Sequence, residues 1–243
     1  MLFSFFKTKG TVSSSELIVD MHSHLIPAID DGAKDIEESL SLLRTFESLG
    51  YHKIITTPHV MLDAYNNTPR RIMEGLEYLS SKAKQAGIRL EIEAAAEYYL
   101  DEGFIEHLHA GDILTIADEY ILFETSYIAK PLYFDEMLVE MVSAGYKPLL
   151  AHPERYRYIH NFESEYRSLK EKGVFFQINI NSFGGYYGKD SKKKAEFLNK
   201  NGMIDFLGSD AHHMKQLETL SIIRKKNFYK DMLKNNTILN NTI

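Results

Sequence analysis

The chain lacks cysteine altogether over its 243 residues. It therefore has no disulfide framework, no zinc–thiolate site and no thiolate nucleophile. Long apolar runs are also absent: no segment approaches the roughly 20 residues of a membrane-spanning helix, and the apolar stretch at residues 1–6 is far shorter than the core of a signal peptide. These absences exclude every hydrolytic mechanism based on a cysteine, and they predict a cytoplasmic protein without stable membrane insertion.

A surplus of positive charge is absent as well. The 28 lysines and arginines stand against 34 aspartates and glutamates, which gives a formal net charge of -6. A nucleic-acid surface is built from a lysine and arginine excess on one face, so we expect no nucleic-acid partner. The charge of an anionic substrate would have to be neutralised locally, for example by metal ions.

Short apolar runs alternate with longer amphipathic stretches along the chain. This alternation is typical of consecutive right-handed βαβ units with a parallel sheet, and the continuous apolarity of the short runs indicates burial on both faces. We expect a single-domain α/β barrel in residues 16–225, preceded by an extension (1–15) and followed by an Asn-rich tail (226–243) that is packed on the barrel or loosely attached to it. The predicted strands are 17–19, 53–56, 89–92, 120–123, 148–150, 174–178 and 204–207, and the main predicted helices are 35–49, 69–86, 133–144, 162–172 and 191–201.

A residue that can bind a metal ion stands at the C-terminal end of almost every predicted strand. Active sites of β/α barrels form at these strand ends, so residues far apart in the sequence would converge there. A lone histidine beside a strand is more often structural than a ligand, but eight such positions at matching strand ends favour a shared metal site. They are His22, His24, His59, Glu97, Glu124, His152, Asp210 and His212.

The spacing of these residues suits metal binding. Alternation along a strand puts His22 and His24 on one face, about 7 Å apart at their Cα atoms, and Asp210 and His212 repeat the spacing with a carboxylate and an imidazole, which suits zinc, manganese or iron. Asp31 lies in the loop after the first strand, where a lone acid is more often a turn or cap residue. Because the ligands exceed what one ion needs, we expect two or three divalent metal ions, with a glutamate of a middle strand, Glu124, as the bridge.

Six motifs in this order resemble those of the polymerase and histidinol phosphatase (PHP) superfamily. More narrowly, they are similar to its bacterial branch of manganese-dependent protein-tyrosine phosphatases from capsular and exopolysaccharide loci. The motifs occupy residues 20–35, 57–59, 96–99, 123–125, 151–156 and 208–212, within a resemblance that runs from about residue 16 to 215. One departure is Ala28, where the family usually has glycine.

The resemblance implies a distorted (β/α)7 TIM-like barrel of PHP type with a trinuclear metal centre, manganese being the expected metal and iron or zinc the alternatives. It raises Asp31 to a ligand, and it implies that Arg155 binds the substrate phosphate while a metal-bridging hydroxide attacks phosphorus. The implied substrate is a phosphotyrosine-containing protein, a membrane-associated bacterial tyrosine kinase that regulates polysaccharide synthesis. The implied ligands are His22, His24, Asp31, His59, Glu97, Glu124, His152, Asp210 and His212.

Three alternative functions are weighed against this one. A small-molecule phosphatase acting on histidinol phosphate or a sugar phosphate would use the same chemistry. An amidohydrolase is disfavoured because Glu124 stands where dinuclear members often have a modified lysine, and the surplus of ligands together with Arg155 disfavours a non-catalytic metal-stabilised module. Tyrosines that could line an aryl slot, or simply pack at the rim, are Tyr98, Tyr99, Tyr127, Tyr156, Tyr186 and Tyr187.

The remaining histidines indicate no chemistry, with one position undecided. His52, His107, His109 and His160 lie outside the strand ends that form the predicted site, whereas His213 adjoins it. The glycine-rich run 184–190 lacks the spacing and the Ser or Thr of a phosphate-binding loop, so we expect a flexible loop there.

Overall fold

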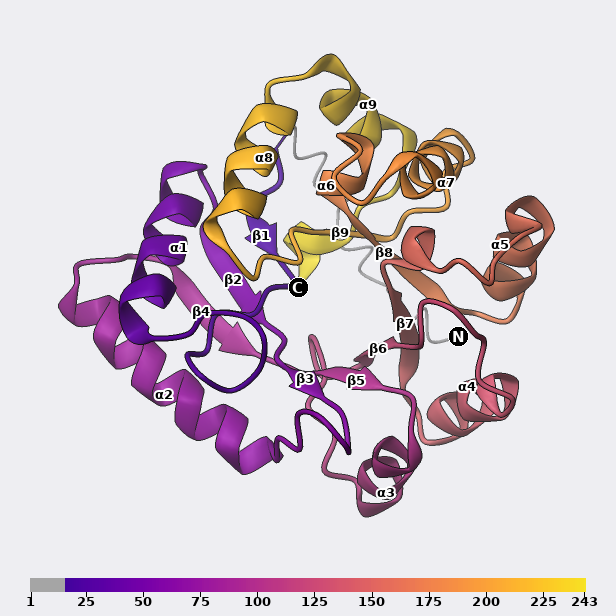
Figure 1. The fold of residues 1–243 in the computed structure, drawn as a ribbon, viewed down its shortest axis with the longest axis horizontal. Coiled ribbons are helices and arrows are strands. Elements are labelled where there is room, and N and C mark those ends of the chain that lie inside the picture. The colour runs from indigo at the N-terminus through magenta and orange to yellow at the C-terminus, as the bar shows by residue number, and fades with distance from the viewer. Residues whose placement is uncertain (1–15) are drawn as a thin grey trace, which may run out of the picture.

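A parallel sheet curls upon itself and is ringed by helices in the computed structural model, which describes residues 16–243 (Figure 1). The expected single-domain α/β fold is confirmed. All strand pairs in the described residues are parallel and form two sheets, with strand orders β1-β2-β4 and β3-β5-β6-β7-β8-β9. The strands are β1 (Val19–Asp20), β2 (Lys53–Thr56), β3 (His59–Val60), β4 (Glu91–Ala94), β5 (Glu97–Tyr99), β6 (Tyr120–Glu124), β7 (Lys147–Ala151), β8 (Phe175–Asn179) and β9 (Phe206–Gly208).

Two of these strands were not predicted from the sequence. All seven predicted strands are present, but β3 and β5 follow β2 and β4 after breaks of two residues, at 57–58 and 95–96. Proline in the first break has no backbone N–H to donate, yet hydrogen bonds from Glu97 N to Pro58 O (3.1 Å) and from Ala95 N to Thr56 O (2.9 Å) carry the pairing across. The breaks therefore divide the sheet without separating its two parts.

The first and last strands meet beyond their regular ends. Ser23 and Ala211 form a parallel bridge. His24 N donates to Ala211 O, and Asp210 N donates to His22 O, both at 2.9 Å. The contact brings the two segments richest in predicted ligands side by side.

Helices follow most strands, and the first two begin at side-chain caps. Asp35 and Thr68 accept hydrogen bonds from Glu38 N and Arg71 N, and proline follows Thr68 at the first helical position. The helices are α1 (Ile36–Ser48), α2 (Pro69–Gln85), α3 (Glu102–Ala110), α4 (Phe134–Ser143), α5 (Phe162–Glu171), α6 (Ile180–Phe183), α7 (Lys189–Lys200), α8 (Met214–Arg224) and α9 (Asn227–Asn235), with short 3-10 helices η1 (Pro153–Arg155) and η2 (Asn240–Thr242).

Both faces of the sheet are buried, as the continuous apolar runs predict. Along β6, Ile121 and Phe123 belong to the large core shared with the helices. Leu122 between them belongs to a smaller cluster made mostly of strand residues, which includes Leu149 and Phe206. Since side chains alternate across a strand, the smaller cluster is the interior of the curled sheet.

The C-terminal tail contacts the barrel through Asn240. This side chain is fully buried, donates to Val19 O (3.0 Å) and Leu207 O (2.7 Å), and accepts from Leu207 N (2.9 Å). Leu239 and Ile243 pack against the interior cluster, so these contacts support packing rather than loose attachment. The predicted N-terminal extension (1–15) lies outside the described residues, and within 16–243 no helix is long and apolar enough to cross a membrane.

Candidate metal centre

All nine side chains that the sequence indicates as ligands come together at the C-terminal ends of the strands. They form four overlapping groups, in each of which the ligand atoms lie within 4.8 Å of one another. The groups are His24, Asp31, His59 and His212; His22, Glu97 and His152; His22, His24 and Asp210; and His59, Glu97 and Glu124. Four residues belong to two groups each, which indicates adjacent positions for more than one ion.

The pair His22 and His24 is arranged so that both histidines present a lone pair to the centre. His22 Nδ1 lies 2.7 Å from Gln177 Oε1, and His24 Nδ1 lies 2.8 Å from Asp30 Oδ2. Because both partners are acceptors, each Nδ1 carries a proton, so each Nε2 is the nitrogen that could bind a metal ion once the ring is neutral. The two Nε2 atoms face one another at 3.4 Å, an arrangement that a cation would stabilise.

Buried polar atoms without hydrogen-bond partners show that the residues fit a metal cluster. Glu97 Oε2 is buried and has no such partner within the described part of the chain, and the same holds for Nδ1 of His59. Glu97 Oε2 lies 3.2 Å from both His22 Nε2 and His59 Nδ1. Uncompensated groups of this kind are costly in a protein interior, and a divalent ion among them would satisfy both. Glu97 belongs to two of the groups and Glu124 to one, so Glu97 would be better placed than Glu124 to contact more than one ion.

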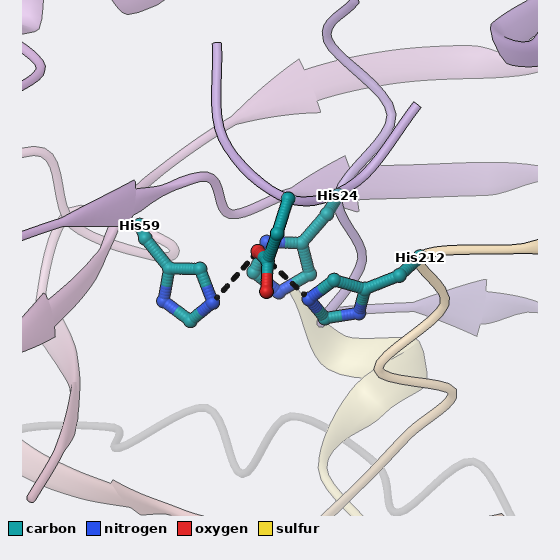
Figure 2. Close-up of side chains that lie close together, drawn as sticks. His24, His59 and His212 are labelled. Carbon is teal, nitrogen blue, oxygen red and sulfur yellow. Dashed lines mark ion pairs between the residues drawn. The ribbon is translucent and has the colours of Figure 1, made fainter. Parts of the chain in front are cut away.

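Asp31 closes the cluster from the loop after β1. Its Oδ1 lies 3.4 Å from His59 Nε2 and 3.3 Å from His212 Nε2, and its side chain is half exposed. Figure 2 shows the rings of His24, His59 and His212 gathered around one point. The centre is therefore buried on the side of Glu97 and open to solvent on the side of Asp31.

Neighbouring charges in the centre favour the ionised form of Glu97 and the protonated form of His59. Burial acts to raise the pKa of Glu97, but the neighbouring His22 and His59 outweigh it and hold that pKa well below the ordinary value. Burial acts to lower the pKa of His59, but the carboxylates of Glu97 and Glu124 raise it to about 9. Protons on the histidines thus balance the carboxylates where metal ions would otherwise do so.

Strand β8 contributes no ligand but orients three of them. Gln177 Oε1 accepts from His22 Nδ1 (2.7 Å) and from His152 N (3.2 Å), while Gln177 Nε2 donates to Asn179 Oδ1 (2.9 Å). Asn179 Nδ2 in turn donates to Asp210 Oδ2 (2.7 Å). Sequence reasoning missed both residues, although two polar side chains on one face of an otherwise apolar strand were the available signal.

Asp30 was also missed, beside the predicted ligand Asp31. Its side chain is buried, and its Oδ2 accepts from His24 Nδ1 (2.8 Å) and His59 N (3.1 Å), while its Oδ1 accepts from Gly32 N (3.0 Å). A Cβ atom at Gly32 would stand 2.2 Å from His24 O. The Asp-Asp-Gly run therefore supplies a second carboxylate that orients a ligand, and a glycine that lets the loop approach it.

Arg155 lies in η1, immediately after β7. Its Nη1 donates to Asp210 Oδ2 at 2.8 Å, and its guanidinium carbon lies 4.6 Å from the ring centre of Tyr127 and 4.3 Å from that of Tyr187. The neighbouring acid Glu154 is not its partner, since Glu154 is buried and its Oε1 accepts a hydrogen bond from Ser182 Oγ (2.6 Å). Arg155 is therefore fixed beside the candidate metal centre.

A cavity of about 260 Å³, here named the mouth cavity, opens above the centre. Its lining includes Met61, Tyr65, Tyr127 and Arg155 together with the ligands Asp31, His59, Glu124, His152, Asp210 and His212. Met61 and Tyr65 escaped sequence analysis because they belong to the loop after β3, a strand that was not predicted. Their backbones exchange hydrogen bonds of 3.0 and 2.9 Å, which fix them side by side.

The structure also places the tyrosines, histidines and glycine-rich run that the sequence singled out beside the nine ligands. Tyr98 and Tyr156 are buried, with their hydroxyls bonded to the backbone, so they form no part of the mouth. His107 and His109 pair with Asp112 and Glu140. His213 is the N-cap residue of α8, and the run 184–190 begins as hydrogen-bonded turns and leads into α7.

Known proteins similar to the chain share both fold and sequence with it. Residues 18–239 match the family profile described as capsular polysaccharide synthesis, CpsB/CapC. Tyrosine-protein phosphatase YwqE of Bacillus subtilis is 33% identical over 199 residues, covering 82% of this chain and 78% of YwqE. A solved structure from work on YwqE and on CpsB of Streptococcus pneumoniae, described as unique metal-dependent tyrosine phosphatases, has a TM-score of 0.79 and 30% identity over 90% of this chain and 96% of that chain. An amidohydrolase from Mycoplasma synoviae, with a TM-score of 0.53 and 12% identity over 92% of this chain and 85% of that chain, shares the fold alone.

Proposed function

Because the chain belongs to the capsular polysaccharide synthesis CpsB/CapC family, we propose that it is a metal-dependent phosphatase that removes the phosphate group from phosphotyrosine in a protein. One observation carries the proposal. Nine ligand-type side chains from distant parts of the chain meet in one buried cluster, with an arginine fixed at its edge. Such a cluster beside an anion-binding group suits hydrolysis of a phosphate ester.

We further propose that the cluster holds two or three divalent ions, with manganese as the expected metal. Divalent ions in such a centre neutralise charge on the phosphate and activate water near neutral pH. The four groups of side chains would hold them, with Glu97 as the bridging carboxylate in place of Glu124. Gln177 and Asp30 keep the Nε2 atoms of His22 and His24 free for this role.

Arg155 is the proposed phosphate clamp. Its bond to Asp210 uses Nη1 and leaves further N–H donors of the planar guanidinium for the non-bridging oxygens of a phosphate. Packing between the rings of Tyr127 and Tyr187 holds the plane of the guanidinium in place. The clamp is therefore preorganised rather than assembled on binding.

The walls of the mouth cavity support an aryl phosphate over a sugar phosphate. Met61 and Tyr65 stand on one loop and Tyr127 on another, and the Tyr65 ring stacks on His59 with centroids 5.5 Å apart. Apolar and aromatic surfaces of this kind pack on an aromatic ring, whereas the hydroxyls of a sugar need hydrogen-bonding groups. Within this proposal the substrate is the phosphotyrosine of a membrane-associated bacterial tyrosine kinase that regulates polysaccharide synthesis, reached from the cytoplasm.

Phosphate release from four substrates tests the proposal. We expect the protein stripped with a chelator to be inactive and the manganese-reloaded protein to act on p-nitrophenyl phosphate and a phosphotyrosine peptide, but weakly on a phosphoserine peptide and on histidinol phosphate. Thiol alkylation should have no effect, since the chain has no cysteine. Undiminished turnover in the metal-stripped protein, or a preference for histidinol phosphate, would contradict it.

A further inference from the structure

Exposed apolar side chains lie on the loops that line the mouth cavity, close in sequence to residues of its lining. Leu62 (43% exposed) follows the cavity residue Met61, Ile128 (75% exposed) follows the cavity residue Tyr127, and Leu132 in the same loop is fully exposed. Tyr186 (38% exposed) precedes Tyr187, which stacks on Arg155. We name these four side chains, Leu62, Ile128, Leu132 and Tyr186, the apolar rim.

The loops that carry the rim are held in defined shapes. Leu62 N donates to Asp101 Oδ2 (2.9 Å), and Tyr186 N donates to Asn181 O (3.2 Å). In the loop after β6, Ser126 Oγ accepts from Ile128 N (3.2 Å), so a local turn points this segment outward. Apolar side chains that ordered turns hold in solvent add nothing to the core, and on loops beside a cavity they are available to contact a bound ligand.

The mouth cavity is large enough for one phosphorylated side chain, so the rest of a protein substrate would lie outside it. Its 260 Å³ lies below the roughly 300–1,000 Å³ of sites that enclose a whole small-molecule ligand, so it suits a single phosphorylated side chain. Consecutive residues of an extended peptide advance by about 3.3 Å. The one or two residues on either side of a bound phosphotyrosine must therefore cross the loops that carry the rim.

We propose that the apolar rim binds the polypeptide on either side of the phosphotyrosine, and that it selects apolar side chains one or two positions away. This inference rests on the proposed function and specifies its substrate. The mouth cavity would recognise the phosphorylated side chain, and the rim would recognise its neighbours. Free aryl phosphates would use the cavity alone.

A double variant, Ile128→Ser with Leu132→Ser, tests the rim in the manganese-loaded protein. The substrates are a phosphotyrosine peptide with leucine at the two positions on each side, the same peptide with serine there, and p-nitrophenyl phosphate. We expect the ratio of kcat/KM for the leucine peptide to kcat/KM for p-nitrophenyl phosphate to fall about tenfold, the loss expected from two partly buried aliphatic side chains. The same ratio for the serine peptide should change less than about twofold.

Ile222→Ser is the matched control, because Ile222 is similarly exposed but lies near the far end of α8. The proposal would be overturned if the double variant left the ratio of kcat/KM for the leucine peptide to kcat/KM for p-nitrophenyl phosphate unchanged. An equal fall of this ratio in the control variant would overturn it as well. Failure of the proposed function looks different: the wild-type protein would then hydrolyse neither phosphotyrosine peptide, and the proposal that the rim binds substrate would be overturned with it.

Discussion

Arg155 and Asp210 share one hydrogen bond that couples the proposed phosphate clamp to a proposed metal ligand. Asp210 Oδ2 accepts from Arg155 Nη1 and Asn179 Nδ2, whereas its Oδ1 lies 3.6 Å from His22 Nε2 and 3.5 Å from His24 Nε2. One oxygen thus orients the carboxylate and the other faces the centre. Removal of the arginine leaves Asn179 in place, so the ligand should stay oriented.

We therefore predict that Arg155→Ala keeps its metal content but loses roughly 100-fold in kcat/KM on an aryl phosphate, about 3 kcal/mol of transition-state binding. Arg155→Lys should restore only part of the loss, because lysine lacks the planar pair of donors. Steady-state kinetics together with elemental analysis measures both quantities. Kinetics close to wild type in the alanine variant would show that the arginine is not the clamp.

Ala28 has a strained backbone conformation, and this predicts that glycine at the same position would stabilise the protein. The related family usually has glycine there, and the structure places Ala28 in the left-handed region with φ of 58°. An alanine in this conformation destabilises the folded state by about 1–2 kcal/mol. Replacement by glycine removes that strain, but glycine loses more backbone entropy on folding, which offsets about 0.5–1 kcal/mol of the gain. Ala28→Gly should thus stabilise the protein by about 0.5–1 kcal/mol.

Urea denaturation measures this change, and Ala144 supplies the control. Ala144 ends α4 with φ of -76°, an ordinary helical value, so Ala144→Gly should leave stability unchanged or lower it. Equal effects of the two substitutions would mean that the left-handed backbone is not the cause.

At the scale of elements, β8 shows what a strand without ligands can do. Gln177 fixes the tautomer of His22 and also holds the backbone of His152. Loss of an outer partner of this kind commonly costs 10–100-fold in metal affinity.

We predict that Gln177→Met lowers affinity for manganese by at least about tenfold while the protein remains folded. A manganese titration measures the affinity, and circular dichroism checks the fold. Gln85→Met, on the exposed face of α2, should bind manganese like wild type; unaltered affinity in the β8 variant would assign Gln177 to packing alone.

The sequence predicts long elements better than short ones, and the reason is physical. Continuous apolar runs of four or five residues are enough to find strands such as β6 and β8. In contrast, β3 and β5 have two and three residues and are aligned by the strands they pair with. Positions that carry their own chemistry, such as His59 and Glu97 in these two short strands, could still be found. Met61 and Tyr65 could not, because a loop's path decides whether an ordinary side chain faces a cavity.

At the scale of the whole molecule, the comparisons with known proteins confirm the predicted family and enzyme class. The hydrogen bond that His24 donates to Asp30 could be found only from the structure. From the sequence alone, either of two adjacent aspartates in one loop is equally good as a metal ligand. Only the folded loop places one outward between His59 and His212 and the other inward against a ring nitrogen.

The protonated histidines predict how the metal-free protein responds to pH. The pKa of His59 is raised from 6.5 to about 9, so the folded state holds a proton that the unfolded chain releases. The resulting stabilisation is complete below about pH 6.5 and is lost as pH rises through about 9. We therefore expect the free energy of unfolding of chelator-treated protein to fall between pH 6.5 and 9, in urea titrations at several pH values.

Metal binding should correspondingly release protons at pH 7.5, since the imidazole must deprotonate to act as a ligand. Calorimetric titration in two buffers of different ionisation enthalpy measures the number released. His109→Gln, at an exposed ion pair far from the centre, should not change it. Manganese binding without proton release would mean that the histidines are already neutral.

The two ends of the described chain lie together at the N-terminal end of β1, whereas the metal centre lies at the C-terminal ends of the strands. Ile18 N donates to Asn241 Oδ1 (3.0 Å), and Asn241 Nδ2 donates to Glu16 O (2.8 Å). A short linker could join residues 16 and 243 without crossing the mouth cavity, and new termini could then be opened in an exposed turn elsewhere. The order in which the ligands occur along the chain is therefore incidental to the centre they form, and a circularly permuted chain should assemble the same cluster.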